Sequence, residues 1–185
     1  RYIVDITGFG THTSVQAAVT QADLDRGGNP NIPVNIIVRA GSYNENVTLL
    51  GGIHLAASQP GRAFATQING TVTLATGGVA SMRGIHIVAA SGDALTVTGT
   101  ANPTQVYIYD ANVEGNGAAN DNAVEISTVV GGSSGVIFDN VNFRKASATP
   151  GLAANVISGT LQGTGGTFNG GNTSATAVQV SDGPN

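Results

Sequence analysis

Three carboxylates near the middle of the chain are the residues whose types and spacing could do chemistry. Asp110 and Asp139 each stand in a short segment between apolar residues, and Glu114 follows Asp110 by four positions. A glycoside hydrolase needs two carboxylates roughly 5–9 Å apart beside an open groove. Aspartates on neighbouring coils of a repeat could reach that separation. If the protein is an enzyme, Asp110, Asp139 and Glu114 are its candidate catalytic residues.

The same aspartates also have a structural explanation. In the repeat described below, Asp110 and Asp139 occupy a two-residue corner, one column apart and on successive coils. Asp and Asn are common in corners because their side chains hydrogen-bond to nearby backbone. The sequence favours this structural role, and we assign no catalytic residue.

Two tyrosines are the candidate ligand-binding residues. Tyr107 and Tyr109 alternate with apolar residues, so their rings should project outward, together with Ile137 on the next coil. Exposed aromatic rings either stack on sugars or are buried against a neighbouring subunit. We expect the subunit contact and keep sugar binding as the alternative.

No metal site or cofactor is expected. The chain has no cysteine, which excludes thiolate ligands, disulfides and thiol nucleophiles. His12, His54 and His86 lie far apart in the sequence and lack the spacing of a zinc site.

Composition excludes two classes of partner. Charged residues make up 10% of the 185 residues and the net charge is −4, with no basic cluster. Nucleic acids and anionic membranes are therefore not expected as partners. No apolar run reaches the roughly 18 residues of a membrane span, so no membrane insertion is expected. A hydrophobic fraction of 41% is too high for a disordered chain.

The first 33 residues have a different character from the rest. Residues 11–25 carry Val15, Ala18, Val19 and Ala22 at helical spacing, with Thr13 or Ser14 as the N-cap and Gly27-Gly28-Asn29-Pro30 as the terminator. Beyond them, residues 34–185 read as short strands with a two-residue period, for example 35–39, 46–50, 53–57 and 71–75. We expect a single domain over 1–185, with an N-terminal cap and a series of coils.

The strands form a repeat of 25 to 30 residues. Four segments align, 80–87, 106–113, 136–143 and 161–168, each with inward candidates at its first, third, sixth and eighth positions. The third positions are Met82, Ile108, Phe138 and Gly163, and we expect these four to stack. A second strand follows each segment, at Leu95/Val97, Val124/Ile126, Val156/Ser158 and Val178/Val180.

This repeat predicts a parallel β-helix. A continuous strand would turn its buried face outward between the third and sixth positions, whereas a two-residue corner keeps both halves facing inward. An up-and-down barrel or a sandwich would not repeat the same corner on every coil. Because like positions stack, Glu114 and Arg144 should form an exposed ion pair.

The first third of the chain resembles the opening of pectin methylesterases, and more broadly the pectin-lyase-like right-handed β-helix superfamily that includes phage and virus tailspikes. The matching motifs are Ser14-Val-Gln-Ala-Ala18 and Gly41-x-Tyr43-x-Glu45-x-Val47. The resemblance implies an all-β right-handed parallel β-helix with a capping helix. It makes Glu45 a turn or surface residue and not a catalytic acid.

The catalytic motifs of that family are not recognisable. Residues 122–126 are the segment most similar to a methylesterase motif, but no Gln-Asp pair follows this segment. The chain also has no Trp. We therefore expect a non-catalytic structural or receptor-binding domain of a virion spike, a fibre or a similar surface protein. The alternative is a polysaccharide lyase, esterase or hydrolase acting on a cell-surface or cell-wall polysaccharide, supported by the fold resemblance alone.

Assembly and location follow from the same resemblance. The sequence starts at Arg1 with no signal-peptide pattern, which suggests a piece of a longer chain. After 182–185 there is no further element to cover the last coil, and an open sheet edge favours association. We expect a homotrimer at a virion surface or outside the cell, with a polysaccharide or host-surface glycan as the candidate ligand.

Overall fold

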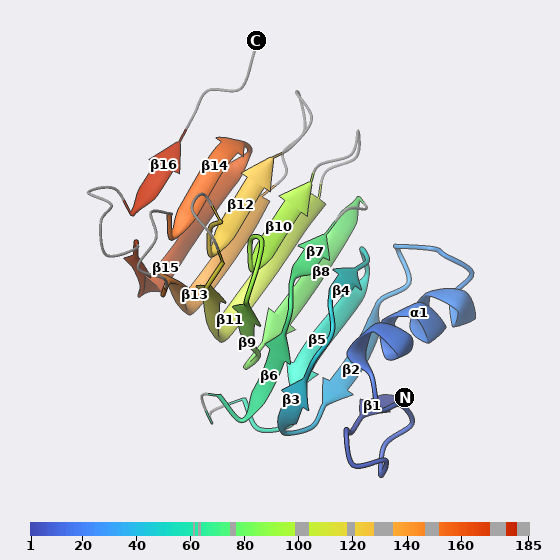
Figure 1. Cartoon of the computed structure of the whole chain (residues 1–185). Coiled ribbons are helices and arrows are strands. Elements are labelled where there is room, and N and C mark those ends of the chain that lie inside the picture. Colours follow the sequence, from blue (N-terminus) through green and yellow to red (C-terminus); the bar gives the residue numbers. More distant parts are fainter. Residues whose placement is uncertain are drawn as a thin grey trace.

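A computed structural model of the chain describes residues 1–60, 62, 64–74, 77–98, 104–117, 121–127, 135–146, 152–170 and 177–180. In this part of the chain, one α-helix and sixteen short strands form a β-solenoid (Figure 1). Its strand pairs are parallel, which a sandwich or an up-and-down barrel would not allow. The predicted parallel β-helix is confirmed.

The strands form two sheets, and each coil of the chain contributes to both. The ten-stranded sheet contains β1 (Tyr2–Val4), β2 (Val34–Val38), β3 (Gly41–Tyr43), β5 (Ile53–Ala57), β6 (Thr66–Asn69), β8 (Gly78–Arg83), β9 (His86–Ala89), β11 (Thr104–Gly115), β13 (Gly135–Lys145) and β15 (Thr160–Asn169). The six-stranded sheet contains β4 (Val47–Leu49), β7 (Val72–Leu74), β10 (Leu95–Thr98), β12 (Val124–Ser127), β14 (Ala154–Ser158) and β16 (Val178–Val180). β11 pairs with both β8 and β9, so one long strand there replaces the two shorter strands of earlier coils.

The strands expected from the sequence lie close to those observed. The expected strand 53–57 coincides with β5, and 35–39 is displaced by one residue from β2. The expected strand 46–50 loses one residue at each end in β4. The expected strand 71–75 contains β7, although residue 75 lies outside the described residues, as do 181–185.

The register of the repeat is the predicted one. Ile108 pairs with Met82 on one side and with Phe138 on the other, and Phe138 pairs with Gly163. These residues therefore lie one above another along the solenoid, with neighbouring strands about 4.8 Å apart. The four repeat segments are confirmed as equivalent parts of successive coils.

One pair of second-strand positions was wrong. Val124 and Ile126 pair with Ala154 and Val156, not with Val156 and Ser158. The register then shifts after Ile126, and Ser127 pairs with Ser158. This irregularity adds one residue to β14, and a bulge of this kind is a common local adjustment in a sheet.

The corner in each repeat segment depends on one residue with left-handed backbone. The fifth position is Gly84, Asp110, Asn140 or Gly165, and its φ is 69°, 50°, 54° or 66° respectively. Gly, Asn and Asp adopt this conformation most readily. The corner therefore explains why Asp110 and Asn140 stand where they do, without any reference to catalysis.

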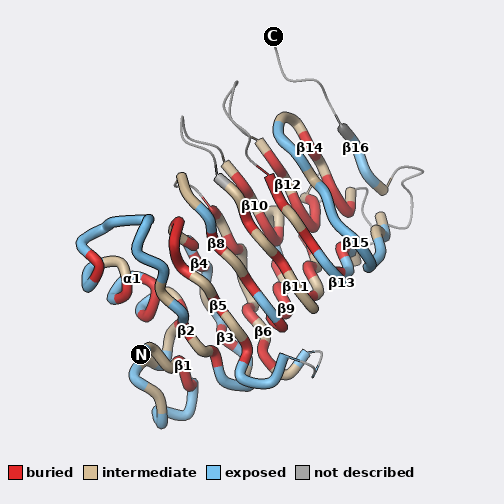
Figure 2. The backbone as a smooth tube through the Cα atoms, turned by 180° about the vertical axis from the view of Figure 1, so that it is seen from behind, coloured by how far each residue is buried: buried red, intermediate tan, exposed pale blue. Residues whose placement is uncertain are grey.

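The core lies between the two sheets. The inward positions of the first three repeat segments are buried, from Ala80 through Phe143. On the last segment Leu161 and Phe168 are only half-buried, and most of β15 is exposed (Figure 2). The core is therefore continuous through β13 and open at the last coil.

The helix α1 spans Val15–Asp25, four residues shorter at its start than expected. Thr11 and His12 instead donate backbone hydrogen bonds to the Ile3 carbonyl, which holds residues 11–12 against β1. Ser14 is the N-cap and accepts from the Ala17 N–H. The predicted inward face is confirmed, because its four apolar residues are fully buried against the core.

Candidate functional site

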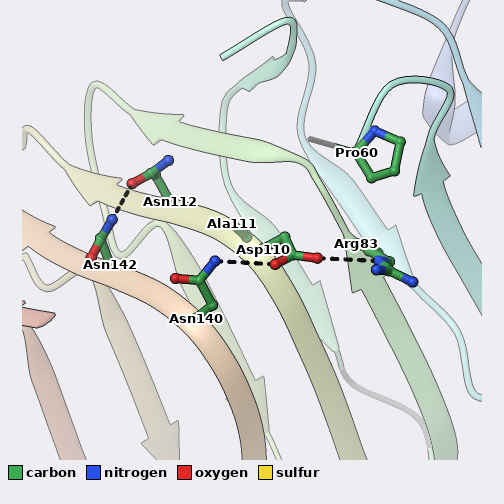
Figure 3. A pocket seen from close by; sticks show the side chains of 7 residues that line it. All are labelled: Pro60, Arg83, Asp110, Ala111, Asn112, Asn140 and Asn142. Atoms are coloured by element: carbon green, nitrogen blue, oxygen red, sulfur yellow. Dashed lines mark hydrogen bonds and ion pairs between the residues drawn. The ribbon is translucent and has the colours of Figure 1, made fainter. Parts of the chain in front are cut away.

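A polar groove lies over the corner between β8, β11 and β13 and contains one of the predicted carboxylates (Figure 3). We call it the corner groove. Its volume is about 290 Å³, and it is lined by Pro60, Arg83, Asp110, Ala111, Asn112, Asn140 and Asn142. The repeat creates it, because equivalent positions of successive coils bring their side chains side by side.

Asp110 is at the centre of a chain of hydrogen bonds along the groove. Its Oδ2 lies 3.2 Å from Nε of Arg83, and its Oδ1 accepts from Nδ2 of Asn140 at 3.1 Å (Figure 3). Both carboxylate oxygens are therefore engaged by neighbouring coils. The Arg83–Asp110 ion pair is well exposed, so it contributes well under about 1 kcal/mol to stability.

A second row of side chains runs parallel to the first. Nδ2 of Asn142 donates to Oδ1 of Asn112 at 2.9 Å, and Oγ1 of Thr167 donates to Oδ1 of Asn142 at 2.9 Å. These residues pair across β11, β13 and β15, so the row is a direct result of the register. The lining of the corner groove takes its hydrogen-bonding groups from β8, β11 and β13, and Thr167 extends the second row beyond the lining.

The predicted pair of catalytic carboxylates does not converge on the groove. Asp139 pairs with Tyr109 and therefore lies one column from Asp110 on the next coil, as expected. It is not part of the groove lining, and its Oδ1 accepts from Oγ1 of Thr164 at 3.0 Å. Each aspartate is thus bonded to a side chain of another coil.

Glu114 lies away from the groove lining, and the predicted contact with Arg144 is confirmed. Glu114 Oε2 lies 3.7 Å from Arg144 Nη1, and the two residues are directly paired in β11 and β13. Glu114 Oε1 also accepts from Nδ2 of Asn116 at 2.9 Å. This carboxylate is therefore part of a surface network.

The two tyrosines lie side by side on the outer face of the ten-stranded sheet. Their ring centroids are 6.4 Å apart and the planes differ by 14°. The Tyr107 hydroxyl donates to Oε1 of Gln105 at 3.2 Å. Tyr107, Tyr109 and Ile137 are all half-buried, so they form a partly exposed apolar surface.

The histidines occupy three separate environments. His12 is bonded to Thr11, and Nδ1 of His54 lies 2.9 Å from Oγ of Ser81. His86 is buried, and neither of its ring nitrogens has a hydrogen-bond partner in the part of the chain that the structure describes. Burial lowers the pKa of His54 and of His86, although the nearby Glu114 partly offsets the effect on the His86 pKa. Among the residues that the structure describes, no group of His, Asp and Glu could hold a metal ion.

Glu45 has a defined structural role that the sequence did not reveal. Its carboxylate accepts from the Ser14 hydroxyl at 2.6 Å, from the Val15 N–H at 2.7 Å and from the Gln16 N–H at 2.9 Å. It is half-buried and satisfies the free N–H groups at the start of α1. These three hydrogen bonds give Glu45 a structural role in the attachment of α1.

The half-buried carboxyl of Asp93, near the six-stranded sheet, was also not a candidate in the sequence analysis. Asp93 Oδ1 accepts from the backbone N–H of Asn122. Burial raises the Asp93 pKa, and the charges of Glu125 and Asp121 raise it further. The carboxyl therefore supports the turn before β12.

The groove residues other than Asp110 were also missed. Arg83, Asn112, Asn140 and Asn142 were not candidates, since single polar residues in a Thr- and Asn-rich chain carry no signal. The repeat alignment contains that signal. Arg83 occupies the fourth position of its segment, Asn140 the fifth, and Asn112 and Asn142 the seventh.

Comparison with known proteins adds no further assignment. Scans of family descriptions, of curated proteins and of solved structures each find no match to this chain. In the described part of the chain, no helix has the length and hydropathy needed to cross a membrane.

Proposed function

We propose that the chain is a non-catalytic β-solenoid domain with a structural or receptor-binding role in a virion spike, a fibre or a similar surface protein outside the cell. The observation that carries this proposal is the position of Asp110 in the corner groove and its bonding to neighbouring coils. A two-carboxylate hydrolase needs both carboxylates beside one groove, but Asp110 is the one predicted carboxylate in the lining of the corner groove, where it is bonded to Arg83 and Asn140. Asp110, the catalytic candidate that lies in the groove, thus connects neighbouring coils through these two contacts.

The finer features of the fold are part of the same proposal. The solenoid winds in the right-handed sense, and α1 caps its first coil, as in the pectin-lyase-like superfamily that the N-terminal motifs resemble. Support comes from the packing of α1 against β1, β2 and β4 and from its fully buried inner face. Covering the first coil would protect its core from water.

Three copies associate through the outer face of the ten-stranded sheet. Support comes from the half-buried surface of Tyr107, Tyr109 and Ile137, next to the exposed Val79. Aromatic side chains are enriched at the centres of interfaces, where the buried surface is also more apolar than at the rim. The polar groove lies at the neighbouring corner and stays available to a receptor.

Two measurements test the proposed function. Light scattering should give about three times the chain mass of 18.4 kDa, and Tyr107→Ser with Tyr109→Ser should lower it. Incubation with soluble polysaccharides should release neither reducing ends nor unsaturated uronides. Release of such products that Asp110→Ala abolishes would show that the domain is a polysaccharide-degrading enzyme.

A further inference from the structure

His86 is a buried histidine whose ring nitrogens have no hydrogen bond in the part of the chain that the structure describes. It begins β9, directly after the corner, and pairs with Gln67 of β6 on one side and with Asn112 of β11 on the other. Its side chain is 7% exposed. Buried polar atoms are normally hydrogen-bonded, and leaving them without a partner is costly. Exposure of the ring to water would relieve that cost.

Two residues between β5 and β6 cover this corner from the preceding coil. The Phe64 ring packs edge-on against the His86 ring, with centroids 4.7 Å apart and planes 79° apart. Pro60 lies over Gly84, because a Cβ built on Gly84 would come within 2.6 Å of the Pro60 Cα. Gly84 and His86 are both buried. Phe64 is therefore the aromatic cover of the His86 ring.

Phe64 is held in an unfavourable conformation. Its φ is 69°, in the left-handed region that bulky residues rarely adopt. Its side chain is 59% exposed, so it gains little from apolar burial. The next residue, Ala65, donates its N–H to the Arg62 carbonyl at 3.2 Å and accepts from the Gly41 N–H at 2.8 Å. Release of the Phe64 ring would relieve the backbone strain at the expense of the contact with His86.

Protonation of His86 shifts this balance toward release. A neutral imidazole tolerates the contact with Phe64, whereas a buried imidazolium without hydrogen-bond acceptors loses its hydration. Burial accordingly lowers the pKa of His86. A ring that water can reach has a pKa of about 6.5. Acid therefore favours the state in which Phe64 has moved away from the ring.

The charged groups around His86 do not compensate for its burial. Of the two strands that pair with β9, β6 carries no charged residue and β11 carries Asp110 and Glu114. Both carboxylates already face an arginine of another coil. Glu114 raises the pKa of His86, but by less than burial lowers it. On the side of the cover, the exposed Arg62 stands two residues before Phe64 and adds positive charge.

We infer that His86 and Phe64 form an acid-operated switch, in which protonation of His86 displaces the Phe64 ring from the corner between β8 and β9. His86 holds the position next to Asn112 in the stack, and Asn112 and Pro60 line the corner groove (Figure 3). Displacement of Phe64 in acid therefore replaces an aromatic cover with an exposed imidazolium beside the groove. The switch is independent of the receptor-binding role proposed above.

Hydrogen exchange of the full chain at pH 7.5 and pH 5.5, corrected for the intrinsic pH dependence of exchange, tests the switch. The Gly41 and Ala65 amides report on the residue that follows Phe64, through the two backbone bonds of Ala65. Because opening binds one proton, their protection should fall severalfold, and by at most about tenfold, at pH 5.5. Protection in β11 and β13 should not change. Constant protection at Gly41 and Ala65, or an equal loss in β11 and β13, would overturn the switch.

Variants identify the group that titrates. His86→Gln should abolish the pH dependence of exchange at Gly41 and Ala65. His54→Gln is the matched control, since His54 is a half-buried histidine of the same sheet whose Nδ1 lies 2.9 Å from Oγ of Ser81. This control should keep the pH dependence. Persistence of the effect in His86→Gln, or its loss in His54→Gln, would contradict the assignment.

The ring of His86 gives a second measurement, which does not depend on the folding of His86→Gln. In a proton NMR titration of the unmodified protein, the His86 ring should titrate below pH 6.5, because burial lowers its pKa. In Phe64→Ala the midpoint should move up toward 6.5, since the ring is then uncovered. A midpoint at 6.5 in the unmodified protein, or one that Phe64→Ala leaves in place, would show that Phe64 does not control the ring.

Discussion

The left-handed corner residue is the smallest feature on which the architecture depends. Asn140 has φ 54°, a conformation that costs about 1–2 kcal/mol for ordinary L-residues and more for β-branched ones. We expect Asn140→Val to lower the free energy of unfolding by about 2 kcal/mol, while Asn140→Gly leaves it within about 1 kcal/mol. Urea denaturation measures both values.

The matched control lies two residues further along β13. Asn142 is exposed and in ordinary strand geometry, where a β-branched side chain is favoured. Asn142→Val should therefore cost much less than Asn140→Val. Equal costs at the two positions would mean that backbone conformation does not explain the residue types at the corner.

His86 makes stability depend on pH. Burial lowers its pKa in the folded state below the unfolded value of about 6.5. The unfolded chain then binds more protons near that pH, so stability is complete above pH 6.5 and falls as the pH drops through 6.5 toward the folded pKa. The unfolding free energy of the protein should decrease from pH 7.5 to pH 5.5.

His54 contributes with the same sign, because burial lowers its pKa as well. Single variants separate the two residues: His86→Gln and His54→Gln should each reduce the pH slope of stability. His86→Gln should have the larger effect, since His86 is the more deeply buried. A slope that His86→Gln leaves unchanged contradicts the assignment.

At the scale of elements, the attachment of α1 depends on a residue thirty positions away. Glu45 accepts three hydrogen bonds at the helix N-terminus, and the loss of a capping side chain costs about 0.5–2 kcal/mol. We expect Glu45→Ala to lower the urea midpoint, with Glu45→Gln intermediate because it keeps acceptor oxygen but no charge. Glu114→Ala, which removes an exposed ion pair, is the control and should have a small effect.

Strand alternation predicted the elements well but could not fix every register. Exchanging Val156 for Ala154 as the partner of Val124 shifts the pairing by two residues. Such a shift keeps the same side chains facing the core, so the apolar pattern looks the same before and after it. A one-residue shift would have put polar residues inside, which is why the longer β11 and β13 were aligned correctly from sequence.

The helix start shows a different limit. Helical spacing of apolar residues located the buried face of α1, but Thr11 and His12 are held by backbone bonds to Ile3. Those bonds depend on where β1 lies in the sheet. The periodicity within residues 11–25 does not carry that information, although Ser14 was correctly predicted as one of two candidate N-caps.

For the whole molecule, the repeat was sufficient to predict the solenoid but not the groove. Stacking of Met82, Ile108 and Phe138 follows from spacing alone. The groove also needs Pro60, and the burial of His86 needs Phe64, both from the segment between β5 and β6. Contacts of a segment with a neighbouring coil are set by tertiary packing, so the sequence pattern could not show them.

Stacked coils contact only their neighbours, so stability should be distributed along the axis. Gly163 in the exposed strand β15 sits against Phe138, and a Cβ there would lie 2.1 Å from the Phe138 carbonyl oxygen. Gly163→Ala should therefore detach β15 while the earlier coils remain folded. Hydrogen exchange should show lost protection in β15 and unchanged protection in β5 and β8.

Ile108 lies in the middle of the stack, in contrast to Gly163 in the exposed strand β15. Its side chain is fully buried between Met82 and Phe138, so Ile108→Ala should cost about 2–5 kcal/mol. Because coils on both sides lose a packing partner, protection should fall in β8, β11 and β13 together. If Gly163→Ala lowered protection as widely as Ile108→Ala, the solenoid would be a single cooperative unit and not a stack of coupled coils.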